Sequence, residues 1–184
     1  SVCSSQTPNE FNASQSPCDL LTLGGGAVFF NTNVGLVAAV EQRNGHIRWL
    51  RRYPRGGMND DNNRAIAVTR GETPCLYHRS ALVVAPADAT SLFALDPSTG
   101  ATLWATEKAY DVEHLLGAED GTVVASGRRL WLLDIATGKV RQRWPDSIAA
   151  GIRGVGRGCI AGREIFWPTE NAIYVFDVVS GGQS

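Results

Sequence analysis

The side chains best suited to chemistry in this sequence are four cysteines, three histidines and one run of Asn and Asp residues. The cysteines form neither a C-x-x-C nor a C-x-x-C-H motif, which argues against a zinc ribbon, a thioredoxin-like dithiol and covalently attached haem. His46, His78 and His114 lack the spacing of a metal site. We expect hydrogen bonds at turns or strand ends from them, with a ligand contact by His78 or His114 as the alternative.

The run Asn59–Asn63 carries side-chain oxygens at alternate positions, which is a feature of calcium loops. It lacks the glycine and the distal glutamate of an EF-hand loop, because Arg64 and Arg70 occupy those positions. This favours a solvated polar loop over a calcium site.

Two features could bind phosphate. Residues Gly156–Ala161 match the pattern G-x-G-x-x-A, but a strand-like segment follows, so no helix N-terminus is expected to hold a phosphate there. Arg51, Arg52 and Arg55 form a short basic cluster beside a proline and two glycines. A solvated loop is the favoured interpretation of this cluster, and a phosphate site is the alternative.

The overall composition narrows the class of protein. A chain of 184 residues that is 43% hydrophobic predicts one folded domain, and its net charge of −1 argues against a nucleic-acid-binding protein. No run of 18 apolar residues is present, so no membrane-spanning helix is expected. Residues 1–18 are polar and lack periodicity, which indicates a linker or incoming loop. A polar start at Ser1 indicates a removed signal peptide or a piece of a longer chain.

One pattern recurs four times and organises the chain. An apolar run ends in an acidic residue, a glycine follows four residues later, and Ser, Thr or Asn precedes that glycine. An acidic side chain can accept hydrogen bonds from the next backbone N–H groups, and glycine supplies the positive φ that closes a hairpin. The four copies are LVAAVEQRNGHIRW at 36–49, SLFALDPSTGATLW at 91–104, RLWLLDIATGKVRQRW at 129–144 and AIYVFDVVSGG at 172–182.

Tryptophans follow three of these turns. Trp49 and Trp104 come four residues after the glycine, and Trp144 comes six residues after it, which predicts a longer or bulged strand in the third copy. We expect these large flat side chains to fill the space between stacked units.

Two shorter strands precede each copy. First strands are expected at roughly 19–23, 74–78, 114–118 and 157–161, and second strands at 27–32, 81–86, 122–126 and 164–169. The middle strands are apolar on both faces, as a sheet covered on both sides requires. The turn glycines recur every 38 to 55 residues, a spacing typical of propeller blades.

The sequence therefore predicts an all-β propeller segment of four-stranded antiparallel blades. Three blades are expected to be complete, and the fourth to lack its outer strand. Their approximate limits are 19–52, 74–107, 114–145 and 157–184, with an inserted loop at 53–73. Such a loop is either a grafted binding element or a simple crossover.

The motif D-x-x-T-G followed by an apolar strand with Trp resembles the repeat of the PQQ-like (quinoprotein-type) β-propellers. The residues that carry the resemblance are Leu95, Asp96, Thr99, Gly100 and Trp104, and then Leu133, Asp134, Thr137, Gly138 and Trp144. The first copy departs from it at Glu41 and Asn44, and the fourth at Ser180. The resemblance implies about seven or eight blades in all, within the range typical of propellers, and therefore a portion of a larger propeller, completed by further chain or by another chain.

The turn acids recur in every copy, which favours an architectural role, and no catalytic, cofactor-binding or metal-binding residue can be assigned. We therefore expect a non-catalytic scaffold or protein-binding module outside the cytoplasm. The alternative that the resemblance implies is part of a quinoprotein dehydrogenase, which holds PQQ over a tryptophan and binds calcium. Trp131 and Trp167 lie outside the post-glycine position and could form that floor, although core packing is the expected role of both.

The cysteines and the resemblance together bear on the compartment. PQQ-like propellers resemble periplasmic or secreted proteins, where disulfides persist. Cys3 and Cys18 flank a segment able to bring two thiols together, so we expect a Cys3–Cys18 disulfide and a periplasmic or secreted location. Cys75 and Cys159 fall in the first strands of two different blades, where separate buried thiols are expected.

Overall fold

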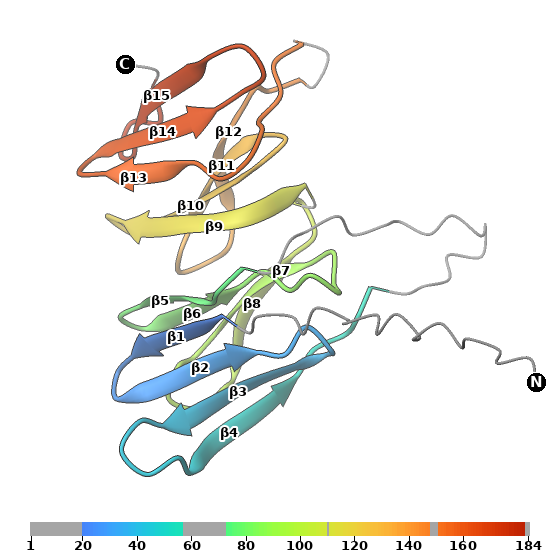
Figure 1. Cartoon of the computed structure of the whole chain (residues 1–184), viewed down its shortest axis with the longest axis vertical. Helices are drawn as coiled ribbons and strands as arrows, with labels where there is room; N and C mark the ends of the chain where they lie inside the picture. The colour runs from blue at the N-terminus through green and yellow to red at the C-terminus, as the bar shows by residue number, and fades with distance from the viewer. Residues whose placement is uncertain (1–19, 57–72, 110, 148–150, 183–184) are drawn as a thin grey trace, which may run out of the picture.

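The computed structural model describes residues 20–56, 73–109, 111–147 and 151–182. Within these residues the chain forms fifteen β-strands in four antiparallel sheets that stack one upon another (Figure 1). Each sheet is a blade built from strands that follow one another along the chain. The predicted all-β propeller segment is confirmed.

Each blade runs from an inner first strand to an outer last strand. Blades 1 and 2 consist of β1 (Leu21–Gly24), β2 (Ala27–Asn31), β3 (Leu36–Glu41) and β4 (Ile47–Arg52), and of β5 (Leu76–His78), β6 (Ala81–Val84), β7 (Leu92–Leu95) and β8 (Thr102–Thr106). Blades 3 and 4 consist of β9 (Val112–Glu119), β10 (Thr122–Gly127), β11 (Leu130–Asp134) and β12 (Val140–Trp144), and of β13 (Cys159–Ala161), β14 (Glu164–Pro168) and β15 (Ile173–Asp177). In the described residues blade 4 therefore has three strands, as expected.

The first strands of successive blades lie next to one another, with β1 beside β5, β5 beside β9 and β9 beside β13. The acid turns and the hairpins between first and second strands lie at one end of the blades, here named the turn end. The other connections, including those from blade to blade, lie at the opposite loop end (Figure 1).

The middle strands are buried on both faces because each central blade packs between two neighbours. Every residue of β6, β7 and β10 is buried. Three separate apolar clusters fill the three interfaces, and their aromatic members include Phe29 and Trp49, then Trp104 and Trp131, then Trp167 and Phe176. The apolar runs of the sequence are thus the two-sided cores of the blades.

The acid turns have the geometry that the repeated spacing predicts. Asp96 Oδ1 accepts from the backbone N of Ser98 at 2.7 Å and of Thr99 at 3.0 Å, while the N of Gly100 (φ +72°) donates to the Asp96 carbonyl at 2.8 Å. Asp134 and Asp177 accept equivalent bonds. The hydrogen bond from the Ser98 hydroxyl, followed by those from the backbone, lowers the pKa of Asp96.

Blade 1 departs from this turn chemistry, as its sequence does. The Glu41 side chain is paired with Arg48 at 2.7 Å and accepts no described hydrogen bond from its own turn. Asn44 Oδ1 accepts from the N of His46 at 3.0 Å, as Thr99 Oγ1 accepts from the N of Ala101 in blade 2. Asparagine therefore takes the place of threonine in this turn, and the bonds to the acidic side chain are the ones that differ.

Trp49 docks blade 1 onto the turn of blade 2, and Trp104 docks blade 2 onto the turn of blade 3. The indole N–H of Trp49 donates to the Pro97 carbonyl at 2.9 Å, and that of Trp104 donates to the Ile135 carbonyl at 2.8 Å. Each ring covers the turn glycine of the following blade, so closely that a Cβ on Gly100 would lie 2.7 Å from the Trp49 ring. We name Trp49 and Trp104 the docking tryptophans.

The third interface corrects one expectation. Gln142 pairs with Leu132 beside a bulge, as Trp104 pairs with Ala94, so Gln142 and not Trp144 holds the docking position. Its Nε2 donates to the Gly181 carbonyl at 2.8 Å. The predicted bulge is present, but the equivalent strands of blades 1 and 2 share it and β12 is no longer than β8. Two extra residues between glycine and tryptophan therefore mean a different role for Trp144.

Trp144 turns into the core of the third interface. Its ring centroid lies 4.6 Å from that of Tyr174, 5.2 Å from that of Phe176 and 5.4 Å from that of Trp167. An aromatic cluster therefore stabilises the interface in which glutamine has replaced the docking tryptophan.

We predict that Trp104→Ala lowers the free energy of unfolding by about 3 to 5 kcal/mol, because it removes a buried ring and leaves the Ile135 carbonyl without its donor. Urea denaturation of the intact protein measures this. Leu103→Ala is the control on the same strand, since 46% of Leu103 is exposed, and it should have little effect. Equal losses in both variants would contradict the docking role.

Candidate binding site between the first two blades

A groove of about 550 Å³ opens between the outer strands of blades 1 and 2, and we name it the blade 1–2 groove. The end of β4 and the residues after it form one wall, and β7 and β8 form the other. Its apolar floor includes Phe93 and Leu95, which are 4% and 1% exposed. The groove therefore offers apolar surface between polar walls.

A buried tyrosine network holds the wall that comes from blade 1. The Tyr53 hydroxyl donates to Asp88 Oδ1 at 2.7 Å and lies 3.1 Å from Asn31 Oδ1. Arg55 Nε donates to Asp88 Oδ2 at 3.0 Å, and the Gly56 N donates to the Asp88 carbonyl at 2.9 Å. Asp88 thus fixes the direction of the chain as it leaves the outer strand of blade 1.

The same network joins the loops of two blades. Asn33 adopts a positive φ of 52°, and its Oδ1 accepts from Asn31 Nδ2 and from the Ala87 N, both at 2.9 Å. Burial, and then the bond to Asp88, raises the pKa of Tyr53 well above its usual range. Tyr53 is therefore a structural hydrogen-bond donor and not an acid at neutral pH.

The rim of the groove is basic. Arg51, Arg52 and Arg55 all line it, against one acidic residue, Glu107. Arg51 Nη2 donates to Thr102 Oγ1 at 2.8 Å, and Arg52 is exposed. We expected these three arginines to lie in a solvated loop, but Arg51 and Arg52 belong to strand β4. Basic side chains over an apolar floor suit an acidic polypeptide segment better than a bare phosphate.

The histidines lie apart from this groove. His46 follows a turn, and His78 and His114 lie half-buried on the inner strands β5 and β9. Burial lowers the pKa of His114. Among the described residues no three His, Cys, Asp or Glu side chains are grouped as a metal site would require.

The cysteines and the glycine pattern are placed as follows. Cys75 is a buried free thiol, and burial raises its pKa to about 12. Cys159 is also free, but it is exposed, so the prediction that it is buried is wrong. It lies on the face of blade 4 that points away from blade 3.

The glycine pattern at Gly156–Ala161 leads into strands β13 and β14 and not into a helix. Cys3, Cys18 and the Asn59–Asn63 run lie outside the described residues.

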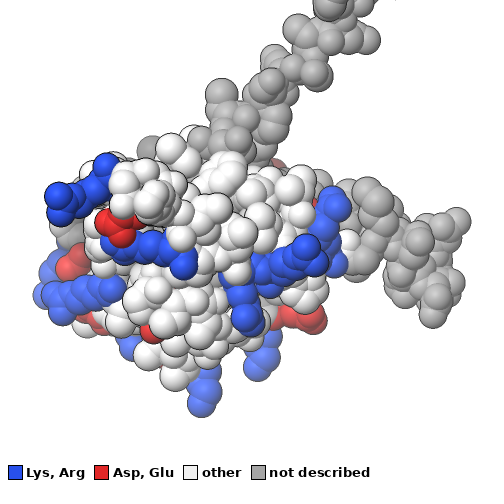
Figure 2. Space-filling model, turned by 90° about the horizontal axis from the view of Figure 1, so that it is seen from below, with Lys and Arg blue, Asp and Glu red and all other residues white. Residues whose placement is uncertain are grey.

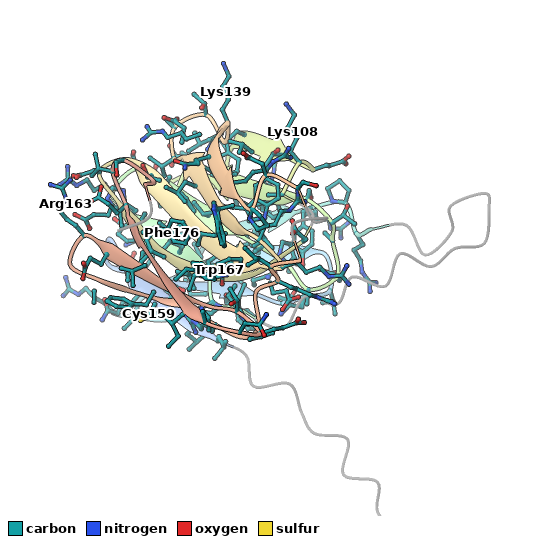
Figure 3. All side chains as sticks on the ribbon, turned by 90° about the horizontal axis from the view of Figure 1, so that it is seen from above. Lys108, Lys139, Cys159, Arg163, Trp167 and Phe176 are labelled. Carbon is teal, nitrogen blue, oxygen red and sulfur yellow. The ribbon has the colours of Figure 1, made fainter. Side chains whose placement is uncertain are left out.

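Trp131 and Trp167 occupy blade interfaces. They are 1% and 0% exposed, and Figure 3 shows Trp167 and Phe176 beneath the strands of blade 4. The Arg129 guanidinium lies 4.6 Å from the Trp131 ring centroid and pairs with the buried Asp111 at 3.0 Å. Neither indole N–H meets a described acceptor. Both rings therefore have the core-packing role that the sequence favours for them.

The Tyr53 network has no local sequence signal. Asp88 lies 35 residues from Tyr53 along the chain and Asn31 lies 22 residues from it, so spacing alone could not connect them. Gln142 could have been found from the repeat, because it stands four residues after Gly138 as the docking tryptophans stand after theirs.

Comparison with known families gives a match that spans most of the chain. Residues 33–183 match the family described as outer membrane protein assembly factor BamB. The chain belongs to this family. No curated protein is matched in sequence.

Solved structures share the fold of this BamB-like chain. BamB from Moraxella catarrhalis is similar with a TM-score of 0.64 and 19% identity over 86% of this chain and 45% of that one. The designed protein Ika4 is similar with a TM-score of 0.61 and 12% identity over 86% of this chain and 89% of that one. Quinohemoprotein alcohol dehydrogenase from Comamonas testosteroni is similar with a TM-score of 0.60 and 15% identity over 89% of this chain and 33% of that one. The chain thus spans less than half of the matched BamB.

The described residues contain no helix that is long and apolar enough to cross a membrane.

We predict that Tyr53→Phe lowers the free energy of unfolding by about 1 to 3 kcal/mol near pH 8, because Asp88 loses its buried donor. Tyr77→Phe is the control, since Tyr77 packs in the same interface with its ring 5.6 Å from Phe29. Urea midpoints at pH 8 measure both.

A comparison of the native protein with Tyr53→Phe also tests the raised pKa of Tyr53. The unfolded chain releases its tyrosine protons near pH 10, whereas folded Tyr53 keeps its proton to higher pH, so its contribution to stability is lost as the pH rises above 10. The gap between the native protein and Tyr53→Phe should therefore narrow from pH 8 to pH 11. A gap that stays constant would contradict the network.

Proposed function

We propose that this BamB-like chain is part of a non-catalytic, extracytoplasmic β-propeller that acts as a scaffold and binds other proteins. The observation that carries the proposal is the family match over residues 33–183, since the family is described as an outer membrane protein assembly factor. Assembly requires protein-binding surfaces, and the blade 1–2 groove is one that the chain itself supplies.

The groove favours a polypeptide with acidic and apolar side chains. Arg52 is exposed at the rim, while Arg51 and Arg55 are held in place by Thr102 and Asp88. Prepositioned guanidinium groups lose less side-chain entropy on binding a carboxylate. Apolar side chains of the partner would be covered by the floor around Phe93 and Leu95.

The quinoprotein dehydrogenase alternative finds no support in the residues that it would need. The almost complete burial of Trp131 and Trp167 supports a packing role for both and not a floor for PQQ. We therefore propose no quinone, and no calcium ion of the kind that the alternative requires. A quinone absorption band and dye-linked alcohol oxidation after incubation with PQQ and calcium would overturn this proposal.

We predict that Arg52→Glu, made in the intact protein, removes a stoichiometric partner that copurifies with the native protein from the cell envelope at low salt. Charge reversal at the rim should weaken binding at least tenfold in a titration with that partner. Arg128→Glu is the control, because Arg128 is also exposed but lies on blade 3. Retention of the partner by both variants would reject the groove as the binding surface.

Periplasmic or secreted location is part of the proposal, and the cysteines test it. We predict two titratable thiols in denaturant before reduction and four after it, because Cys75 and Cys159 are free and Cys3 and Cys18 are expected to be paired. Four titratable thiols both before and after reduction would mean that Cys3 and Cys18 are not paired, and the proposed periplasmic or secreted location would lose the support of a disulfide.

A further inference from the structure

A second groove, with a volume of about 470 Å³, opens one blade further along, between the outer strands of blades 2 and 3. We name it the blade 2–3 groove. Lys108, which follows β8, lies on one side of it, and residues of β11 and β12 form the other side. Its apolar lining consists of Trp131 and Val140, and both pack in the apolar cluster between these two blades. Blade 2 therefore has a groove on each side.

The two grooves occupy equivalent places in the repeat. Trp131 pairs with Arg143 across the strands of blade 3, as Phe93 pairs with Ala105 across the strands of blade 2. Phe93 and Ala105 line the blade 1–2 groove, whereas Trp131 and Arg143 line the blade 2–3 groove. An aromatic floor beside the outer strand therefore recurs at a spacing of one blade.

The blade 2–3 groove is also basic. Lys108, Arg141 and Arg143 line it, against one acidic residue, Asp146, and all four are exposed. Arg141 is paired with Asp134, whereas Lys108 and Arg143 form no ion pair with a described residue. Figure 3 shows Lys108 projecting outward from the molecule. At least two cations of this groove are therefore available to carboxylates of a partner.

The surface between the grooves is continuous. Glu107 lines the first groove and its neighbour Lys108 lines the second, so only the outer strand β8 separates them. Leu103 and Ala105 are exposed on this strand and extend the apolar surface across it. Viewed from the side of blade 1, the molecule has basic side chains around much of its outline, with fewer acidic ones among them (Figure 2).

The distance from one groove to the other suits a short stretch of extended polypeptide. Sheets packed face to face lie about 10 Å apart, and an extended chain advances about 3.3 Å per residue. A segment of fewer than about ten residues can therefore reach from one groove to the next.

We infer that the two grooves together bind one extended, acidic segment of a partner protein, which crosses the outer edge of blade 2. Apolar side chains of this segment lie over Phe93 in one groove and over Trp131 in the other, and its carboxylates meet the two basic rims. A bare anion would leave both apolar floors uncovered. The inference rests on the proposed function, because the blade 1–2 groove is the first of the two anchoring points.

The test measures the binding of two fluorescein-labelled peptides to the intact protein at low salt by fluorescence anisotropy. The one-anchor peptide is a single Glu-Leu-Glu triplet. The two-anchor peptide has two such triplets joined by a Gly-Ser linker of about eight residues, whose root-mean-square length is about 16 Å. The two-anchor peptide should bind about tenfold more tightly or better, because its second triplet binds at a high effective concentration.

Arg52→Glu and Arg143→Glu each remove one anchoring point. Either variant should bind the two-anchor peptide about tenfold more weakly, with the affinity of the one-anchor peptide. The one-anchor peptide itself should lose no more than about twofold in either variant, because it can still use the other groove. Arg128→Glu is the control, since Arg128 is exposed on blade 3 and lines neither groove, and it should change neither affinity. Urea midpoints show that the variants are folded.

Three results would overturn the inference: equal affinities of the two peptides or no binding of either, equal binding of a two-anchor peptide with Lys in place of Glu, and tighter binding of anionic lipid vesicles. A loss of affinity in Arg52→Glu but not in Arg143→Glu would overturn it too, while the proposed function would stand on the blade 1–2 groove alone. If both variants weaken the two-anchor peptide but Arg52→Glu keeps the copurifying partner, the linked grooves are supported and the proposed function fails.

Discussion

A β-sheet with two apolar faces must have a neighbour on each side, and the rest of this structure depends on that constraint. Blades 2 and 3 satisfy it fully, since their middle strands are buried among three successive apolar clusters. Apolar contact alone does not fix the angle between two sheets. The docking tryptophans do so, because each indole N–H must reach one carbonyl while its ring covers one glycine.

The two ends of the blades are stabilised by different means. At the turn end each aspartate accepts hydrogen bonds from its own turn, so the chemistry is local and repeats with the sequence. At the loop end the polar contacts join segments far apart in the chain, as in Tyr53 with Asp88 and Arg129 with Asp111. Because these contacts differ from blade to blade, the loop end is where the chain can acquire a surface of its own, such as the blade 1–2 groove.

The contrast between local contacts at the turn end and long-range contacts at the loop end explains which features could be predicted from the sequence. The acid-to-glycine spacing and the apolar runs were sufficient for the strands, the turns and the stacking of blades, because those features are encoded within each repeat. The Tyr53 network was not predictable, since its members meet only after two blades have packed. The exposed Cys159 was misjudged for a related reason: its burial depends on whether a sheet covers the far face of blade 4.

The third interface shows that docking and core packing can substitute for one another. Gln142 also donates a hydrogen bond to the following turn, but to the carbonyl of the turn glycine Gly181 and not to that of the residue after the acid, and it lacks the large ring. A tryptophan, Trp144, stands two residues later, and its ring packs against those of Trp167, Tyr174 and Phe176. Apolar burial has thus moved from the edge of the interface to its centre, while a polar side chain still fixes the register. A position four residues after the turn glycine therefore requires a donor side chain of sufficient reach, and tryptophan is the residue that supplies both the donor and the apolar area.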